Sequence, residues 1–172
     1  MIVDDSIPQN VSMEDLADLL IDGARYDEAE DVQTALDLNV DVNATDNNGR
    51  TALHMASGNG HTSIAQTLID AGADVGAKNE EGNTPLHFAC LNGHVDIVKM
   101  LMLHGASPSE LNRHSRTPVD EALGRPFQDT VVDVVNSFFK QPLVEVDQMQ
   151  QEGEVGEDEA EEDHPEEVDD MH

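Results

Sequence analysis

"TPLHFACLNGHVDIVKMLMLHGA" occupies residues 84–106 of the chain, and "TALHMASGNGHTSIAQTLIDAGA" occupies residues 51–73. The two stretches begin 33 residues apart and agree in the order of their small, apolar and turn-forming residues. A period of this size is typical of stacked supersecondary units, each of which is too small to bury its own apolar face. This internal repeat therefore decides the fold class.

The same period extends to both sides of the quoted copies. Thr51 and Thr84 continue in Thr117, and a shift upstream leads from Leu53 to Leu20. The sequence predicts four units, at about 14–46, 47–79, 80–112 and 113–141, preceded by a flexible N-terminus at 1–13.

The local signals within one unit predict a helix, a turn, a second helix and a projecting loop. Thr84 is a favourable N-cap, and Pro85 suits the first helical position because its missing N–H would have no partner there. Gly93 and Gly105 each follow an apolar segment, where a residue in the left-handed conformation commonly ends a helix. Asn39 takes the place of Gly105 in the first unit, and asparagine tolerates positive φ. The fold class is therefore all-α, a solenoid of four helix pairs with projecting loops.

The two end units differ from the middle ones, as the terminal caps of a stack do. The first unit lacks the Thr-x-Leu-His opening, and residues 1–46 hold thirteen acidic residues and only Arg25 as a basic one. The last unit has Arg125, Pro126 and Phe127 where the third has Asn, Gly and His. A final helix is expected to close the stack with an apolar stripe of Val131, Val135, Phe138 and Phe139.

The composition changes near Glu145. Residues 145–172 hold fourteen acidic residues and no Lys or Arg. Such a segment buries too little apolar surface to offset the entropy of ordering it. We therefore expect a disordered acidic tail over residues 142–172.

The net charge of −29 at pH 7 narrows the classes of partner. Such a chain repels DNA, RNA and anionic lipid, and it attracts basic proteins. We therefore expect a basic protein partner, no direct contact with nucleic acid and no contact with membranes. The attraction speeds encounter and weakens with salt.

The remaining bulk features indicate a cytoplasmic protein. Cys90 is the only cysteine, so no internal disulfide can form, and a reducing compartment is the simpler assumption. The N-terminus "MIVDDSIPQN" has no basic segment followed by an apolar one, and no apolar run approaches the ~18 residues of a membrane span. We expect a soluble monomer, and entry into the nucleus stays open.

The sequence offers no arrangement that is typical of an enzyme. It has no nucleophile with an orienting base, no Gly-rich phosphate loop and no paired carboxylates in a defined pocket. His54 and His87 occupy equivalent positions of two units, as do His61 and His94, so we interpret all four as structural. Cys90 is interpreted as a small core residue. We expect no catalysis, no cofactor and no bound metal.

The opening and closing segments of the units carry a family resemblance. "TALHMASGNGH" and "TPLHFACLNGH", followed by "AGAD" and "HGAS" respectively, resemble ankyrin repeats. The resemblance implies an α-solenoid that binds a protein with its loop tips and inner helices. It also implies that His54 and His87 hydrogen-bond to neighbouring loops. The outer units depart from the pattern, so their limits are the doubtful part of the prediction.

The resemblance points to a set of partner-binding residues. The predicted loop-tip positions are Asn47, Asn48, Arg50, Glu80, Glu81, Asn83, Arg113 and Arg116. The predicted inner-helix positions are Tyr26, Met55, Asn59, Phe88, Leu91 and Asn92. Apolar members would serve as anchors, while the acidic ones, together with Asp27 and Asp46, would meet Lys or Arg of the partner. Whether Met55 and Phe88 contact the partner or only pack between units is left open.

A narrower resemblance concerns the whole chain. Four ankyrin units followed by a strongly acidic tail are similar to the small ankyrin-repeat chaperones dedicated to a ribosomal protein, whose known client is the third protein of the small subunit. This resemblance implies a non-enzymatic escort that shields a basic ribosomal protein until assembly. The loop between the second and third units has ordinary length here, whereas those chaperones can carry an insertion. The alternative is an adaptor or regulator that docks on a signalling enzyme or a transcription factor, and fold alone does not separate the two.

Overall fold

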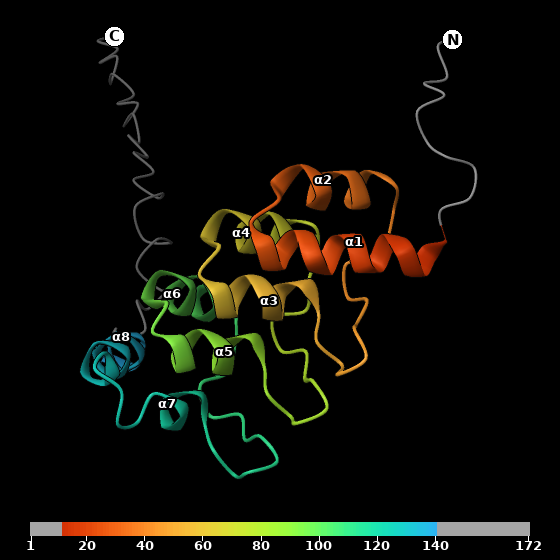
Figure 1. Cartoon of the computed structure of the whole chain (residues 1–172). Coiled ribbons are helices and arrows are strands. Elements are labelled where there is room, and N and C mark those ends of the chain that lie inside the picture. The colour runs from red at the N-terminus through yellow and green to blue at the C-terminus, as the bar shows by residue number, and fades with distance from the viewer. Residues whose placement is uncertain (1–11, 141–172) are drawn as a thin grey trace, which may run out of the picture. The chain divides into compact units, whose positions relative to one another are not determined.

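A computed structural model of the chain describes residues 12–140. Four helix pairs follow one another in this part of the chain (Figure 1). They are α1 (Met13–Tyr26) with α2 (Ala29–Asp37), α3 (Ala52–Asn59) with α4 (Thr62–Asp70), α5 (Pro85–Asn92) with α6 (Val95–Leu103), and α7 (Pro118–Glu121) with α8 (Gln128–Lys140). No strand occurs within residues 12–140, where an isolated antiparallel bridge joins Thr45 and Thr51. The predicted all-α solenoid of four helix pairs is confirmed, and the predicted acidic tail lies outside the described residues.

The helices form two layers. The inner helices α1, α3, α5 and α7 lie side by side in chain order, and each contacts the next (Figure 1). In the second layer α4, α6 and α8 adjoin one another in the same order, while α2 packs on α1. The three loops that lead from a second helix to the next inner helix project beyond the layers (Figure 1). The stack therefore has a row of loops beside a row of inner helices.

The ends of the helices follow the predicted signals. Thr84 is the N-cap of α5 with Pro85 at its first position, and Gly93 ends this helix at a φ of 74°. Gly105 and Asn39 follow second helices with φ angles of 91° and 58°. The caps predicted at Thr84, Gly93, Gly105 and Asn39 are thus confirmed, because each is a residue type that this backbone geometry favours.

The core runs without interruption between the layers. Leu20, Leu53 and Leu86 stand in equivalent positions of three units and have no exposed surface. Small residues beside them let neighbouring inner helices approach closely, namely Ala24, Ala56, Ala89 and Ala122. Cys90 is also fully buried, and burial raises the pKa of its thiol to about 12. This confirms Cys90 as a core residue, and its protonated thiol is unreactive at neutral pH.

The end units depart from the middle ones in the lengths of their helices. The helix α1 has 14 residues because Ser12 and Asp15 cap it reciprocally, six positions before the place equivalent to Thr51. At the other end α7 has only four residues. The inner helix of the first unit is therefore longer than those of the middle units, and the inner helix of the last unit is shorter.

The expected apolar stripe of α8 is wrong at Phe139. Val131 and Val135 are buried and Phe138 is half-buried, but Phe139 is 69% exposed. Eight residues advance an α-helix by about 80° beyond two full turns, so Phe139 lies at the flank of the face that contains Val131. No further unit follows within residues 12–140 to cover that flank.

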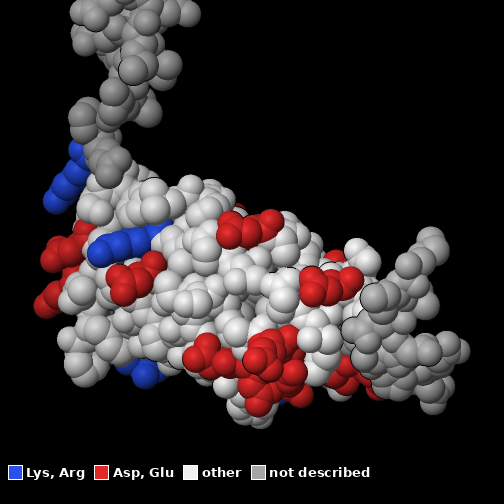
Figure 2. Space-filling model, turned by 90° about the horizontal axis from the view of Figure 1, so that it is seen from above, with Lys and Arg blue, Asp and Glu red and all other residues white. Residues whose placement is uncertain are grey.

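Acidic side chains dominate the surface of the first unit. Residues 12–46 contain eleven acidic residues and Arg25 as the single basic one. Figure 2 shows several groups of carboxylates and few basic groups on the face seen from above. Three of these carboxylates lie close together: a hydrogen bond with Asp31, loss of hydration and repulsion from Asp31 and Asp22 raise the pKa of the exposed Glu28. Such crowding favours the approach of positive charge.

Candidate functional site

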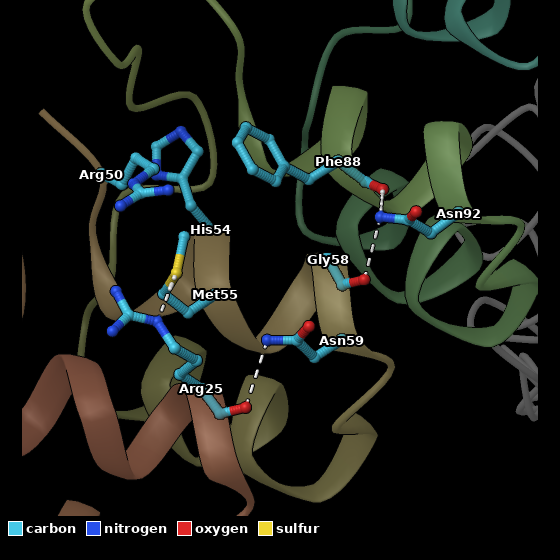
Figure 3. A pocket seen from close by; sticks show the side chains of 8 residues that line it. All are labelled: Arg25, Arg50, His54, Met55, Gly58, Asn59, Phe88 and Asn92. Carbon is cyan, nitrogen blue, oxygen red and sulfur yellow. Dashed lines mark hydrogen bonds between the residues drawn. The ribbon is translucent and has the colours of Figure 1, made fainter. Parts of the chain in front are cut away.

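Four hollows adjoin one another along the inner helices and the projecting loops, and we call them together the groove. The first has a volume of 270 Å³ and is lined by Arg25, Arg50, His54, Met55, Gly58, Asn59, Phe88 and Asn92 (Figure 3). Arg50 and Phe88 also line the second hollow, of 240 Å³. Phe88 and Glu81 connect the second to the third, of 280 Å³, and Glu121 connects the third to the fourth, of 340 Å³.

The groove contains most of the predicted binding residues. Those that line it are Asn48, Arg50, Met55, Asn59, Glu80, Glu81, Asn83, Phe88, Leu91, Asn92 and Arg116. The others line none of the four hollows, namely Tyr26, Asp27, Asp46, Asn47 and Arg113. Loop tips and inner helices therefore form one surface, while the roles of its residues in binding stay predictions.

Met55 and Phe88 have different surroundings. Met55 is 6% exposed, and its sulfur lies 3.5 Å from Nε of Arg25. Phe88 is half-buried, and its ring meets that of His54 edge-on with 5.5 Å between the ring centres. Phe88 lines three of the four hollows, so it forms the main apolar surface of the groove. Met55 packs mainly between the units.

Asp46 is already engaged within its own loop. Its carboxylate accepts hydrogen bonds from the backbone N–H groups of Asn48 and Arg50, each at 2.9 Å, and from Nε of Arg50 at 2.8 Å. Burial would raise the pKa of Asp46, but the hydrogen bonds from Arg50 and Asn48 outweigh it and hold the pKa below its usual value. Asn79 and Asn112 bind the next two loops in the same way. Asp46 thus shapes the loop, and a contact with a partner's Lys or Arg stays a prediction.

Glu80 and Glu81 stand at the tip of the middle loop. Backbone hydrogen bonds tie this tip to its neighbours: the N–H of Glu80 donates to Asn48 at 3.1 Å, and the carbonyl of Glu81 accepts from Arg113 at 2.8 Å. The carboxylate of Glu80 has no hydrogen bond or ion pair within residues 12–140, and that of Glu81 accepts from Asn83 at 3.2 Å. Both side chains are exposed. The fixed backbone therefore presents two accessible carboxylates to the groove.

His54 and His87 join each inner helix to the following loop. The backbone N–H of Thr51 donates to Nδ1 of His54 at 3.1 Å, and that of Thr84 donates to Nδ1 of His87 at the same distance. Nδ1 is thus an acceptor, so the neutral ring carries its proton on Nε2. Nε2 donates to the carbonyl of Asn83 from His54, at 2.9 Å, and to that of Arg116 from His87, at 3.1 Å. Both histidines are structural, as predicted.

The second histidine of each middle unit binds backward along the stack. Nε2 of His61 donates to the carbonyl of Arg25 at 3.1 Å, and Nε2 of His94 donates to that of Gly58 at 3.0 Å. Asn59 and Asn92 donate to the same two carbonyls, at 3.1 and 2.9 Å (Figure 3). These side chains satisfy carbonyls near the ends of inner helices, which otherwise lack partners.

Comparison with known families agrees with this geometry. The family model for ankyrin repeats, in three copies, matches residues 15–114. This span is more than half of the chain. The chain belongs to the ankyrin-repeat family. Ankyrin repeats are protein-interaction modules and are generally non-enzymatic. No curated protein matches the chain.

The fourth helix pair of this ankyrin stack lies beyond the matched residues. It is placed by its contacts, because α7 packs on α5 and α8 packs on α6. Among the described residues no group of three or more His, Cys, Asp or Glu is arranged to hold a metal ion. No helix in residues 12–140 has both the length and the apolar character for crossing a membrane.

Sequence reasoning missed Arg25 as a groove residue. Its equivalents in the next two ankyrin units are Gly58 and Leu91, so the 33-residue period gives no indication of a cation there. Its guanidinium nevertheless lines the first hollow (Figure 3). The only signal was that Arg25 is the single basic residue of a strongly acidic unit. Glu121 was missed as well, because it belongs to the atypical last unit.

The buried histidines predict a pH dependence of stability. Burial lowers the pKa of His54 and of His87, although their carbonyl partners oppose this effect. An unfolded histidine titrates near 6.5, so below that pH the unfolded chain binds more protons than the folded one. The free energy of unfolding of the ankyrin stack therefore has its full value above about pH 6.5. It decreases as the pH falls from there toward the lowered pKa values of the two histidines in the folded chain. Urea unfolding at about pH 7.5 and 5.5 measures the difference.

Two double variants test whether His54 and His87 cause this pH dependence. The double variant His54→Gln/His87→Gln should show a smaller loss of stability between the two pH values than the natural chain. His104→Gln/His114→Gln removes two exposed histidines and should leave the loss unchanged. An equal loss in all three proteins would show that other groups cause it.

Proposed function

We propose that the protein is a non-enzymatic escort that holds a basic client, a small-subunit ribosomal protein, before its assembly. The observation that carries the proposal is the pair of accessible carboxylates at Glu80 and Glu81 beside an apolar groove surface at Phe88. An apolar anchor next to charged groups is a common arrangement in protein interfaces. A Lys- or Arg-rich client would find both contacts along the row of loops.

The acidic first unit supports the same proposal. A hydrogen bond with Asp31, loss of hydration and repulsion from Asp31 and Asp22 together raise the pKa of Glu28, so part of the shift is repulsion between carboxylates. A bound cationic segment relieves this repulsion, so the gain on binding is larger than for an isolated ion pair. The net charge of −29 also draws a cationic protein toward the stack before contact is made. The same negative charge should repel nucleic acid and so keep it away from the bound client.

Reversal of charge at the middle loop tests the proposal. The variant Glu80→Lys/Glu81→Lys should bind its client at least about tenfold more weakly, because two attractive contacts become repulsive. The fold should be retained, since the tip is held by backbone hydrogen bonds. The measurement is affinity purification from the native cells with nuclease treatment, followed by mass spectrometry and a Kd for the purified client.

The control keeps the change of net charge and moves it away from the groove. Asp70→Lys/Asp133→Lys alters two exposed helix residues that lie outside the acidic first unit and line none of the four hollows. This variant should retain the client. Capture of a kinase, ligase or transcription factor in place of a ribosomal protein would overturn the escort role and favour the adaptor. Equal loss in both variants would mean that only net charge matters.

A further inference from the structure

The groove is not uniformly acidic, although the chain as a whole is. The charged residues that line the first hollow are Arg25 and Arg50, and no acidic residue lines it. Glu80 and Glu81 line the second hollow beside Arg50, and Glu81 and Glu121 line the third beside Arg116. Acidic residues therefore line the groove only beyond the first hollow.

The two arginines of the first hollow are held by carboxylates that lie outside it. Nη1 of Arg25 lies 2.6 Å from Asp22, and Nη2 of Arg50 lies 2.7 Å from Asp46. Asp46 also lies 3.8 Å from Nη2 of Arg25, but it does not line the hollow and its oxygens already accept two backbone N–H groups.

Each guanidinium has five N–H donors, and neither of these two uses all of them within residues 12–140. The two groups lie along one side of the hollow, with Phe88 and Asn92 across from them (Figure 3). Planar carboxylates match the fork of donors that a guanidinium offers. The first hollow is therefore suited to a carboxylate beside an apolar surface.

The third hollow has the opposite character. Glu81 is exposed at the loop tip, and Glu121 lies on the inner helix α7. Glu121 accepts from Nδ2 of Asn112 at 2.8 Å, and its ion pair with Arg116 is long, at 3.6 Å. Arg116 has a side chain that is 60% exposed, so it can move away from Glu121 at little cost. A Lys or Arg of a partner that enters this hollow would face both glutamates.

We propose that the groove recognises a segment with one acidic and one basic side chain, the acidic one at Arg25 and Arg50 and the basic one at Glu81 and Glu121. This proposal rests on the proposed function, because it names the client segment that the escort binds. The first hollow lies between α1, α3 and α5, and the third lies beside α5 and α7, so they are one to one and a half interhelix spacings apart, roughly 9–14 Å when neighbouring helices pack 8–10 Å apart. The two charges should then be about three to four residues apart in an extended segment or about six to nine in a helical one.

The proposal separates encounter from recognition. The negative field of the whole chain attracts any polycation, but a uniformly basic segment would place a Lys or Arg against Arg25 and Arg50. Such a like-charge contact weakens binding. A segment with a correctly placed Asp or Glu is therefore selected from an otherwise basic client.

Labelled peptides of about 15 residues, rich in Ala and Gln around a central Leu, test the proposal by fluorescence anisotropy on the full chain. One set carries Asp and Lys at separations of about three to ten residues, and matched sets carry Gln and Lys or Lys and Lys. The measurements use about 0.3 M salt, where long-range attraction is screened. At the best separation the Asp and Lys peptide should bind about tenfold more tightly than either matched peptide.

Variants of the chain assign the preference to the arginines. The preference for Asp should disappear in Arg25→Gln/Arg50→Gln and persist in Glu81→Gln/Glu121→Gln, which should instead weaken the binding of all the Lys-containing peptides. Thermal unfolding checks each variant. Should the double arginine variant fail to fold, Arg25→Gln alone serves, because it leaves the pairing of Asp46 with Arg50 intact.

Two results would overturn the proposal. One is equal binding of the Asp and Lys peptides and their matched controls, including no binding at all, at every separation. The other is a preference for Asp that Arg25→Gln does not reduce. Failure of the proposed function would be seen in a different experiment, the identification of the client captured from cells. A chain that captures a basic ribosomal protein without any preference for Asp remains an escort and loses only this inference.

Discussion

Replacing Gly93 with alanine should lower the free energy of unfolding by about 2–4 kcal/mol. Gly93 ends α5 at a φ of 74°, where a side chain costs roughly 1–2 kcal/mol of backbone strain. A Cβ atom there would also lie 2.5 Å from the ring of Phe127, so the ring must move. Phe127 packs against the core that joins the last two helix pairs, and its displacement adds a packing loss. Urea denaturation of the full chain measures the total.

Gly105→Ala separates the two contributions. Gly105 has a similar φ of 91°, but nothing lies within 4 Å of the position of a Cβ atom. This variant should lose only the strain, about 1–2 kcal/mol. Equal losses in the two variants would mean that Phe127 adapts to the methyl group without cost. The double variant Gly93→Ala/Phe127→Ala should lose less than the sum of its single changes, because both remove the same packing contact.

The variant His87→Leu should destabilise the stack by about 2–4 kcal/mol. Leucine fills much of the same space, but it removes the acceptor of the Thr84 N–H and a donor to the Arg116 carbonyl. Thr84 is buried, and a buried N–H without a partner costs about 1–3 kcal/mol. The carbonyl still accepts from the N–H of Asn112, so its loss is smaller. Chemical denaturation at about pH 7.5, where the natural histidine is neutral, measures the effect.

His104→Leu is the matched control for that variant. His104 is exposed, and its ring bonds only to the carbonyl of Met100, four residues earlier, at 2.8 Å. The same chemical change should therefore alter stability by no more than about 0.5 kcal/mol. Similar losses at the two positions would argue that removal of the ring itself, rather than of its link between units, is what destabilises the protein.

The helix pairs were predictable because their signals are local and repeated. Thr84, Gly93 and Gly105 each determine a helix end through their own backbone preferences, and the period of 33 residues transfers the result to the next unit. Asn39 was predictable for the same reason, since it replaces glycine at an equivalent position. Exposure of Phe139 was not, because it depends on what packs beyond the helix rather than on the sequence within it.

The groove was predictable only in part. Phe88 and Glu81 occupy positions that the family resemblance marks as partner-facing, and the structure places both in the groove. Arg25 was missed because the first unit does not follow the pattern, so no equivalent residue indicates its surroundings. Asp46 was predicted to face a partner, yet its carboxylate binds the loop to which it belongs. Which of several nearby acids remains accessible depends on hydrogen bonds that the sequence does not reveal.

Asp120 caps the last inner helix without linking it to a following loop. It takes the place of His54 and His87 in the last unit, and its carboxylate accepts the N–H of Thr117 at 2.9 Å as the histidines accept theirs. A carboxylate cannot also donate to the carbonyl of a following loop, which is what the histidines do through Nε2. Each histidine thus both caps its own helix and holds the next loop, whereas Asp120 does only the first. A further unit appended after α7 and α8 would therefore lack the link to the preceding helix that His54 and His87 provide in the middle units.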